Sequence, residues 1–466
     1  MTASKKIAFF SIPAHGHTNP LIPVARELVN RGDIVRFYSF DEFEEKIKAT
    51  GAEFISCSSF LPKITEKEKE NLKKISTTEM TIQDIRITLS MNDFLQKEFE
   101  SFSPDVVFSD SVCFWGKLNA WKFDVPLVVS TTTFAFNQLS STYMKKSGSE
   151  MADMIFGLSK VAKELKALEP YGYKVKSTLS LVQSDNETDS IVYTSRRFQP
   201  YSASYSDHYE FVGPSVYTDK VPNKNNSRPL LYISMGTILN EKPDFYKNCI
   251  AAFKDSNIDV IISCGHQTDI KSLGTVPDNI KFYPYVDQLD VLSRANAFIT
   301  HCGMNSVSES LYMAAPMVLF PQTGEQHAVA RRVSEIGAGI YLKSDSPEDI
   351  RKAVDEIIAN KSYADAAEEG SRDFRSCSGA KGAADFVENA PKKSNGVDCL
   401  KELNKANGNF QKIYWAIMAV IIVAVGVFIG WKIAPCVGIP AGMLSYPIGK
   451  AFQQKWYEKF EKSNNL

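Results

Sequence analysis

The first 130 residues alternate short apolar runs with segments whose apolar residues recur at helical spacing. The run from Lys6 to Ser11 is predicted to be a strand. The apolar positions between Leu21 and Val29 have the three- and four-residue spacing of a helix, which Gly32 would end. Further strands are predicted at residues 34–38, 54–56, 106–109 and 127–130. Strands that alternate with helices predict a parallel sheet with helices on both faces.

A polar stretch at residues 217–228 interrupts this pattern and is predicted to be a linker. A second series of apolar runs then predicts strands at residues 230–234, 260–263, 280–283, 297–300 and 317–320. We therefore predict an α/β protein with two doubly wound, Rossmann-like domains at residues 1–216 and 229–390. A polar connector is predicted at residues 391–412.

Residues 413–431 form a long apolar segment without a charged side chain. A helix of this length spans roughly 30 Å, the thickness of the hydrocarbon core of a bilayer. Tyr414, Trp415 and Trp431 lie near its ends, where aromatic side chains favour the membrane interface. The pattern predicts a C-terminal transmembrane helix at residues 413–431 and a membrane-associated tail at residues 432–466. A buried core helix is the alternative.

Composition narrows the class of protein. The net charge of −1 argues against nucleic acid as a partner. The eight cysteines include no C-x-x-C pair, so neither a zinc site nor a disulfide framework is indicated. The apolar run that follows Lys6 is not followed by a signal-peptide cleavage site. We therefore expect a membrane protein with a single-pass or hairpin C-terminal anchor and its main body in the cytosol.

The segment from His301 to Gln326 concentrates polar side chains at a predicted strand-to-helix turn. Free N–H groups at the start of a helix favour an anion, and Gly303 lets the backbone approach it closely. Glu309 within the helix, and Glu325 with Gln326 after the next strand, can bind hydroxyl groups. An anion site ringed by such groups suits a nucleotide-diphosphate sugar. For His301 alone, the alternative is an ordinary core histidine.

The pattern HCGxNSxxE from His301, followed by two prolines and by EQ at residues 325–326, resembles the donor-binding signature of family 1 glycosyltransferases. That family includes UDP-glycosyltransferases of plants and animals and bacterial macrolide glycosyltransferases. The resemblance spans most of residues 5–390. It implies the GT-B fold, in which two Rossmann-like domains face a cleft. Residues 1–216 would then bind the acceptor, and residues 229–390 would bind the nucleotide sugar.

The loop between Pro13 and Pro20 contains GHxNP, which resembles the motif of the family's catalytic base and implies that role for His17. Histidine suits the task because its unperturbed pKa is about 6.5. The start of a helix beside His17 is expected to keep the ring neutral. Asp110 matches the carboxylate that orients the base, although alone it would be an ordinary turn residue. His15 is expected to shape the pocket.

The resemblance also implies which residues hold the donor. Each of the following residues is implied to contact the diphosphate, the ribose, the sugar or the base. In chain order they are Ser234, Gly236, Thr237, Tyr285, Gln288, His301, Gly303, Asn305, Ser306, Glu309, Glu325 and Gln326. The family's usual W-x-P-Q is replaced here by Tyr285-Val-Asp287-Gln288, and we expect Asp287 to loosen that loop. The chain contains no D-x-D, so neither a metal nor another cofactor is expected.

Together these features predict an inverting UDP-glycosyltransferase, specifically a hexosyltransferase. It would move a hexose, with glucose the expected sugar, from a UDP-sugar to a hydroxyl of a lipophilic small molecule or membrane lipid. The expected partners are the UDP-sugar, the lipophilic acceptor and the lipid bilayer, with no nucleic acid. Two alternatives remain open at this point: a UDP-sugar epimerase, and a UDP-sugar-binding membrane scaffold without turnover.

Overall fold

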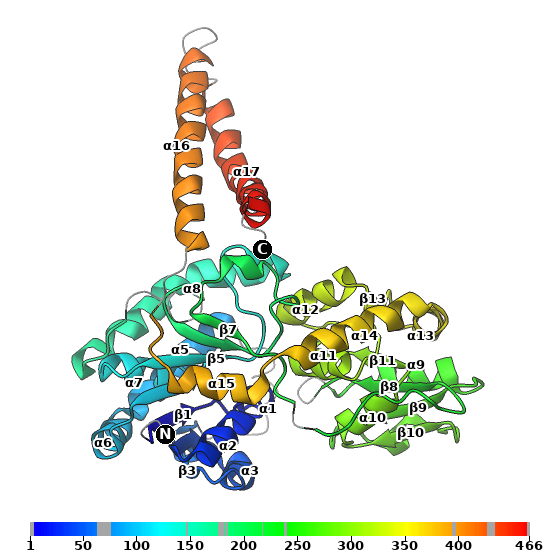
Figure 1. Ribbon diagram of the computed structural model, residues 1–466. Helices are drawn as coiled ribbons and strands as arrows, with labels where there is room; N and C mark the ends of the chain where they lie inside the picture. Colours follow the sequence, from blue (N-terminus) through cyan, green and yellow to red (C-terminus); the bar gives the residue numbers. More distant parts are fainter. Residues whose placement is uncertain are drawn as a thin grey trace.

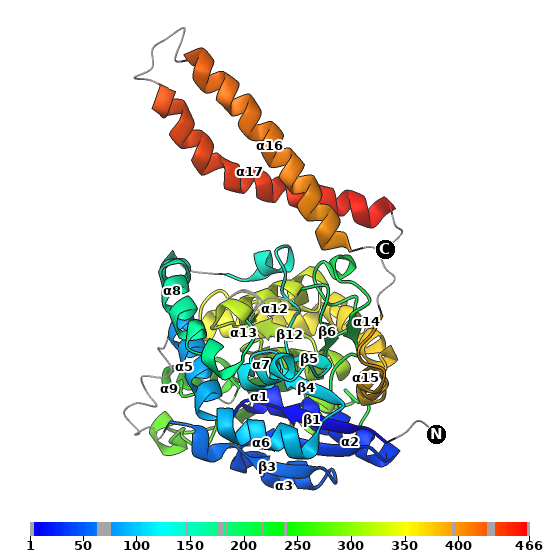
Figure 2. The same ribbon diagram turned by 90° about the vertical axis from the view of Figure 1, so that its left-hand side faces the viewer.

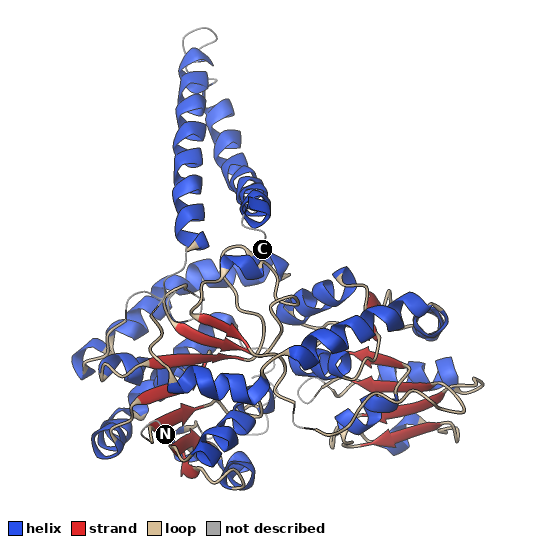
Figure 3. Ribbon diagram, viewed as in Figure 1, coloured by secondary structure: helices blue, strands red, loops and turns tan. Residues whose placement is uncertain are grey.

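The computed structural model describes residues 4–62, 76–145, 148–175, 181, 185–216, 218–236, 240–393, 398–425 and 434–463. Two sheets, each flanked by helices, lie side by side, and a helical hairpin projects from the body (Figure 1, Figure 3). The two parallel-sheet domains predicted from the sequence are therefore confirmed.

The first sheet has seven parallel strands in the order β3-β2-β1-β4-β5-β6-β7. Its strands are β1 (Lys6–Phe10), β2 (Ile34–Ser39), β3 (Glu53–Ser56), β4 (Val106–Asp110), β5 (Leu127–Thr131), β6 (Asp189–Val192) and β7 (Tyr209–Phe211). Its helices are α1 (His15–Thr18), α2 (Leu21–Arg31), α3 (Glu44–Lys48), α5 (Thr77–Ser90), α6 (Asn92–Phe102), α7 (Phe114–Lys122) and α8 (Gly148–Lys166). The strand order reverses between β1 and β4, which opens a crevice at their carboxyl ends.

Aromatic side chains fill both faces of this sheet at its centre. The ring centroid of Phe9 in β1 lies 5.2 Å from Phe37 in β2 and 4.9 Å from Phe108 in β4. The next residue, Phe10, stacks on Tyr38 at 4.6 Å. Successive strand side chains point to opposite faces, so β1 is buried on both, as expected for a parallel sheet covered by helices. This packing fixes the ends of β1 and β4.

The second sheet has six parallel strands in the order β10-β9-β8-β11-β12-β13. Its strands are β8 (Leu230–Ser234), β9 (Asp259–Ser263), β10 (Ile280–Tyr283), β11 (Ala297–Thr300), β12 (Met317–Leu319) and β13 (Gly339–Tyr341). Its helices are α9 (Pro243–Phe253), α10 (Gln288–Arg294), α11 (Met304–Tyr312), α12 (Gly324–Glu335), α13 (Pro347–Ala359) and α14 (Lys361–Ser376). Here the order reverses between β8 and β11.

Helix α15 (Gly379–Glu388) leaves the second domain and packs on α2 of the first. Arg31 Nη1 lies 2.6 Å from Asp385 Oδ1 and 2.5 Å from Glu388 Oε2. Ala383 and Val387 are buried in the core of the first sheet. The chain therefore crosses between the domains twice, which ties them together.

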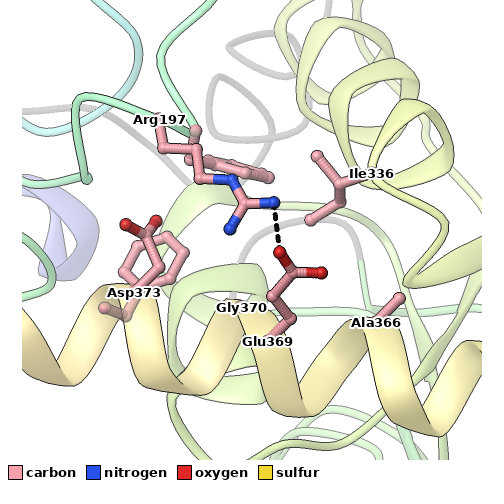
Figure 4. Close-up of a pocket in the computed structure, with 8 residues that line it drawn as sticks. Arg197, Ile336, Ala366, Glu369, Gly370 and Asp373 are labelled. Carbon is pink, nitrogen blue, oxygen red and sulfur yellow. Dashed lines mark hydrogen bonds and ion pairs between the residues drawn. The ribbon is translucent and has the colours of Figure 1, made fainter.

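A small pocket marks another contact between the domains (Figure 4). Arg197 Nη2 donates to Glu369 Oε1 at 2.5 Å, and the Phe198 and Phe374 rings lie 5.6 Å apart. The pocket's free volume of about 20 Å³ has room for a single water. It is therefore a gap in the domain interface and is too small for a substrate.

Helices α16 (Cys399–Val425) and α17 (Ala434–Ser463) pack against each other as a hairpin (Figure 1, Figure 2). The rings of Phe410 and Phe452 stack at 4.3 Å. At the base of the hairpin, Leu403 and Tyr457 are buried together with Leu139 of the body. The hairpin is thus joined to the first domain by an apolar contact.

The predicted transmembrane helix at residues 413–431, and the membrane anchoring that followed from it, must be corrected. Within the part of the chain that the structure describes, no helix is long and apolar enough to cross a membrane. The apolar residues from Ile413 onward continue a helix that starts at Cys399 and carries Lys405 and Lys412 in its earlier turns. Residues 426–433, which include the end of the predicted span, lie outside the described residues.

Candidate active site

The first half of the site lies where the strand order of the first sheet reverses. His17 is in α1, directly after β1, and Asp110 ends β4. His17 Nδ1 lies 2.9 Å from Asp110 Oδ2, and Asp110 Oδ1 accepts a hydrogen bond from the Val112 N–H at 3.0 Å. The Thr132 hydroxyl lies 3.2 Å from the same ring nitrogen. Support through Nδ1 leaves Nε2 as the nitrogen that can take a proton from a substrate.

The charge of Asp110 dominates the electrostatics of His17. Burial lowers the pKa of His17, but the charge and hydrogen bond of Asp110, together with the charge of Glu325, raise it to above the ordinary 6.5. The start of a helix was expected to keep the ring neutral, but the effect of Asp110 and Glu325 on the pKa acts in the opposite direction and favours the protonated ring. Asp110 is fully buried, whereas the His17 side chain is 31% exposed, so a substrate can reach the ring. The pair is therefore arranged to stabilise the imidazolium that forms when His17 accepts a proton.

His15 lies on the same loop but faces other groups. Its ring packs edge-on against Phe43 at 5.0 Å, and its Nε2 lies 3.9 Å from Glu42 Oε2. That separation is too long for a hydrogen bond. Of the two loop histidines, His17 is the one with a hydrogen bond to a carboxylate.

The second half of the site lies at the matching reversal between β8 and β11. Gly236 follows β8, and His301 and Gly303 follow β11. A Cβ atom added at either glycine would lie 2.6 Å from His301 Nε2, so both backbones fit closely around this ring. Gly236 also has φ +80°, which favours glycine. Ser234 Oγ accepts a hydrogen bond from the Gly236 N–H at 3.4 Å, whereas Thr237 lies outside the described residues.

His301 is held in its neutral form. Burial lowers the pKa of His301 to about 4, against a smaller opposing effect of a hydrogen bond to the Ser234 backbone. Its Nδ1 is buried and has no hydrogen-bond partner in the described part of the chain. The ring lies beside Gly303, the N-cap of α11, where N–H groups favour an anion. His301 can therefore contribute a hydrogen bond to an anion there, but not a positive charge.

Glu309 is the centre of a partly buried hydrogen-bond network. Its Oε2 accepts from Gln288 Nε2 at 2.7 Å, and Gln288 Oε1 accepts from the Tyr232 hydroxyl at 3.1 Å. Gln288 Nε2 also lies 3.4 Å from Ser306 Oγ. Burial raises the pKa of Glu309 to about 7, with the hydrogen bond from Gln288 opposing the shift. The carboxyl group of Glu309 therefore changes its charge near neutral pH.

The loop before α10 is more firmly held than the sequence suggests. Asp287 caps α10 by accepting from the Asp290 N–H at 3.2 Å, and its other oxygen accepts from Lys220 Nζ at 2.9 Å. The expected loosening by Asp287 is therefore not seen. Tyr285 is 77% exposed, so its ring face is available for stacking on a planar ligand.

Glu325 and Gln326 lie in the first turn of α12. Thr323 caps this helix, and Gln326 Oε1 accepts from the Gln322 N–H at 2.8 Å. Glu325 is exposed and close enough to His17 to affect its pKa. Asn305 also reaches the first domain, where its Nδ2 donates to the Gly16 carbonyl at 3.1 Å. The structure thus brings the two predicted groups of residues together from opposite domains.

Helices α5, α7 and α8 pack together in the first domain. They share an apolar cluster that includes Ile85, Phe114 and Val161. Burial and the charge of Asp110 raise the pKa of Asp84 in α5 to about 7. No recognisable motif contains Asp84, Thr132 or Tyr232, so these residues were not predicted to lie near the site. Among the described residues, no group of three His, Cys, Asp or Glu side chains could hold a metal ion.

Comparison with known proteins shows similarity along most of the chain. A sequence profile described as UDP-glucoronosyl and UDP-glucosyl transferase matches residues 219–372. The chain is 32% identical over 400 residues to an uncharacterized UDP-glucosyltransferase of Bacillus subtilis, which covers 83% of this chain and 98% of that relative. It is 33% identical over 403 residues to an NDP-glycosyltransferase of Bacillus licheniformis, at 82% and 97% coverage. The crystal structure of a calicheamicin glycosyltransferase matches with a TM-score of 0.70 and 25% identity, over 84% of this chain and all of that one.

Proposed function

Because this chain belongs to the family 1 glycosyltransferases, we propose that it transfers a hexose from a UDP-sugar to a hydroxyl of a lipophilic small molecule. The observation that carries the proposal is the His17–Asp110 pair, which lies within electrostatic range of Glu325 from the donor domain. Glucose is the proposed sugar. A relative named as a glucosyltransferase and the Glu325-Gln326 pair at the start of α12 support that choice.

In the proposed reaction, His17 Nε2 takes the hydroxyl proton of the acceptor while the acceptor oxygen bonds to the anomeric carbon of the sugar. The bond from that carbon to the diphosphate oxygen breaks, and UDP leaves with the electron pair. A single displacement from the opposite face inverts the anomeric centre. Asp110 stabilises the imidazolium that results.

The donor would lie along the second sheet. Its diphosphate is proposed to sit at the start of α11, against His301 and the backbone of Gly236 and Gly303. Its ribose would hydrogen-bond to Glu309, and its base would stack on Tyr285. This arrangement uses helix N–H groups and neutral donors, so we propose that the reaction needs neither a metal nor another cofactor.

The proposal is tested by incubating the purified full chain with a panel of UDP-sugars and hydroxylated aromatic or terpenoid acceptors, with products read by mass spectrometry. We expect a product heavier than the acceptor by one hexose, formed fastest from UDP-glucose. Conversion of one UDP-sugar into another would instead support an epimerase. Binding of UDP-sugar with no product from any acceptor would support a binding scaffold.

A further inference from the structure

A single side chain joins the donor helix to the loop of the catalytic base. Asn305 is in α11 of the second domain, and its Nδ2 donates to the carbonyl oxygen of Gly16 at 3.1 Å. Gly16 directly precedes His17 in α1. The contact therefore spans the cleft and ends one residue from the base.

The Gly16 carbonyl needs this donor because its own helix cannot supply one. In a helix the carbonyl of residue 16 would accept from the N–H of residue 20, but residue 20 is a proline and has no N–H. The neighbouring carbonyl of His15 is satisfied by the Asn19 N–H at 3.0 Å. Because of Pro20, the Gly16 carbonyl has no hydrogen-bond donor within α1. The Asn305 side chain of the second domain donates to it instead.

The rest of the turn is held from within the first domain. The Thr18 hydroxyl donates to the Ile12 carbonyl at 2.9 Å and lies 3.1 Å from Ser11 Oγ. The His17 N–H donates to the Ala14 carbonyl at 3.0 Å. Asn305 therefore supplies the contact that fixes this turn relative to the donor domain.

We propose that Asn305 is a positioning residue, which holds the His17 turn in register with the donor domain through the Gly16 carbonyl. An amide NH2 group has two hydrogens, so one can bond to Gly16 while the other faces a donor diphosphate at the start of α11. Donor binding and placement of the base are then coupled through one side chain. The inference rests on the proposed function and adds a role for Asn305 beyond donor contact.

The test is a double-mutant cycle, in which Asn305→Ala is compared in the unaltered chain and in the His17→Ala variant. Ser306→Ala serves as the matched control because Ser306 is the next residue of the same helix and is bonded within its own domain. A phenol acceptor of low pKa keeps turnover of the His17→Ala variant measurable. Turnover is measured at saturating UDP-sugar, and UDP affinity is measured separately by calorimetry.

We expect Asn305→Ala to lower turnover by roughly 3- to 10-fold in the unaltered chain, the worth of one hydrogen bond. It should lower turnover little or not at all when His17 is already absent, because the two residues act through one step. Ser306→Ala should have the same effect on turnover in both backgrounds. Equal loss of turnover from Asn305→Ala in both backgrounds, or loss of UDP affinity alone, would overturn the inference. Failure of the proposed function would look different, because the unaltered chain would then bind UDP without transferring sugar.

Discussion

At the scale of single residues, Asp110 shows how hydrogen bonds stabilise a buried carboxyl group. A carboxylate with no solvent exposure is costly unless it is paired and hydrogen-bonded. Here His17 and the Val112 N–H meet both of its oxygens. The hydrogen bond between Asp110 and His17 stabilises the buried carboxylate and also holds the imidazole in place. Removal of His17 therefore removes the imidazole and also one of the partners of Asp110.

We expect His17→Ala to lower turnover by about 10² to 10⁴, the usual contribution of a general base. UDP affinity should change little, because His17 belongs to the first domain and the proposed donor site lies on the second. Steady-state kinetics together with calorimetry would check both expectations. Near-normal turnover in a correctly folded variant would place the base elsewhere, with His15 as the next candidate.

Glu309 gives a prediction about pH. Burial raises its pKa from 4.5 to about 7 in the folded chain, so the folded state binds more protons than the unfolded state between these values. Its contribution to stability is therefore present below pH 4.5 and is lost as pH rises towards 7. Binding of UDP-glucose should change in the opposite direction and tighten as pH rises through about 7, because ribose hydroxyls bind best to the charged carboxylate.

The uncharged variant Glu309→Gln provides the control. It should bind UDP-glucose more weakly by roughly 1–3 kcal/mol at high pH and should lose the pH dependence. Calorimetry on either side of pH 7 measures both effects. A wild-type affinity that stays constant across this range would show that Glu309 does not meet the ribose as a carboxylate.

At the scale of elements, the sequence predicted the strands that bear the site and missed shorter ones. The sequence has an apolar run before each motif of the site. In the structure these runs are the strands β1, β4, β8 and β11. Strands β6, β7 and β13 were not predicted, and none of them has more than two apolar residues in a row. Tyr232 and Thr132 were missed for a related reason, because the register that brings them to the site is set by pairing between strands.

Helix α11 gives a prediction about metal ions. We propose that its N–H groups and His301 hold the diphosphate, a role that a divalent ion would otherwise fill. Transfer should therefore persist in excess EDTA at the rate measured without it. Loss of activity in EDTA and its recovery on addition of magnesium or manganese would contradict a metal-free reaction.

At the scale of the whole molecule, contacts between segments far apart in the chain could not be predicted from the sequence. Local patterns identify two domains, but they cannot show that α15 returns to α2, or that Asn305 reaches Gly16. The apolar run from Ile413 likewise predicted a membrane span. In the structure it belongs to α16, which begins at Cys399 and packs against α17. Helix α17 covers only part of this run, since Ile413, Ile417 and Val420 are 61%, 55% and 70% exposed.

The hairpin of α16 and α17 gives the last prediction, since it meets the body through aromatic rings. Tyr457 lies 4.9 Å from Tyr201, which lies 5.9 Å from Tyr143, and the Tyr143 hydroxyl donates to Glu335 of α12 at 2.7 Å. A chain that ends at residue 393 keeps both sheets, α15 and every described candidate site residue. It should therefore bind UDP with an affinity within about two-fold of the full chain, because distant sites act independently.

The same truncated chain should unfold more easily, because removal of the hairpin exposes Leu139. Burial of such a side chain is worth about 1.5–3 kcal/mol. Calorimetry with UDP and thermal unfolding of both chains would separate the two effects. Tyr457→Phe provides a mild control, because it removes the hydrogen bond that the Tyr457 hydroxyl accepts from the Ala203 N–H and the one that it donates to Glu461, and it keeps the ring. If the truncated chain folds but no longer binds UDP, the hairpin must support the donor site through Tyr143 and α12. Unchanged binding with lower stability would instead show that its contact with the body stabilises the fold alone.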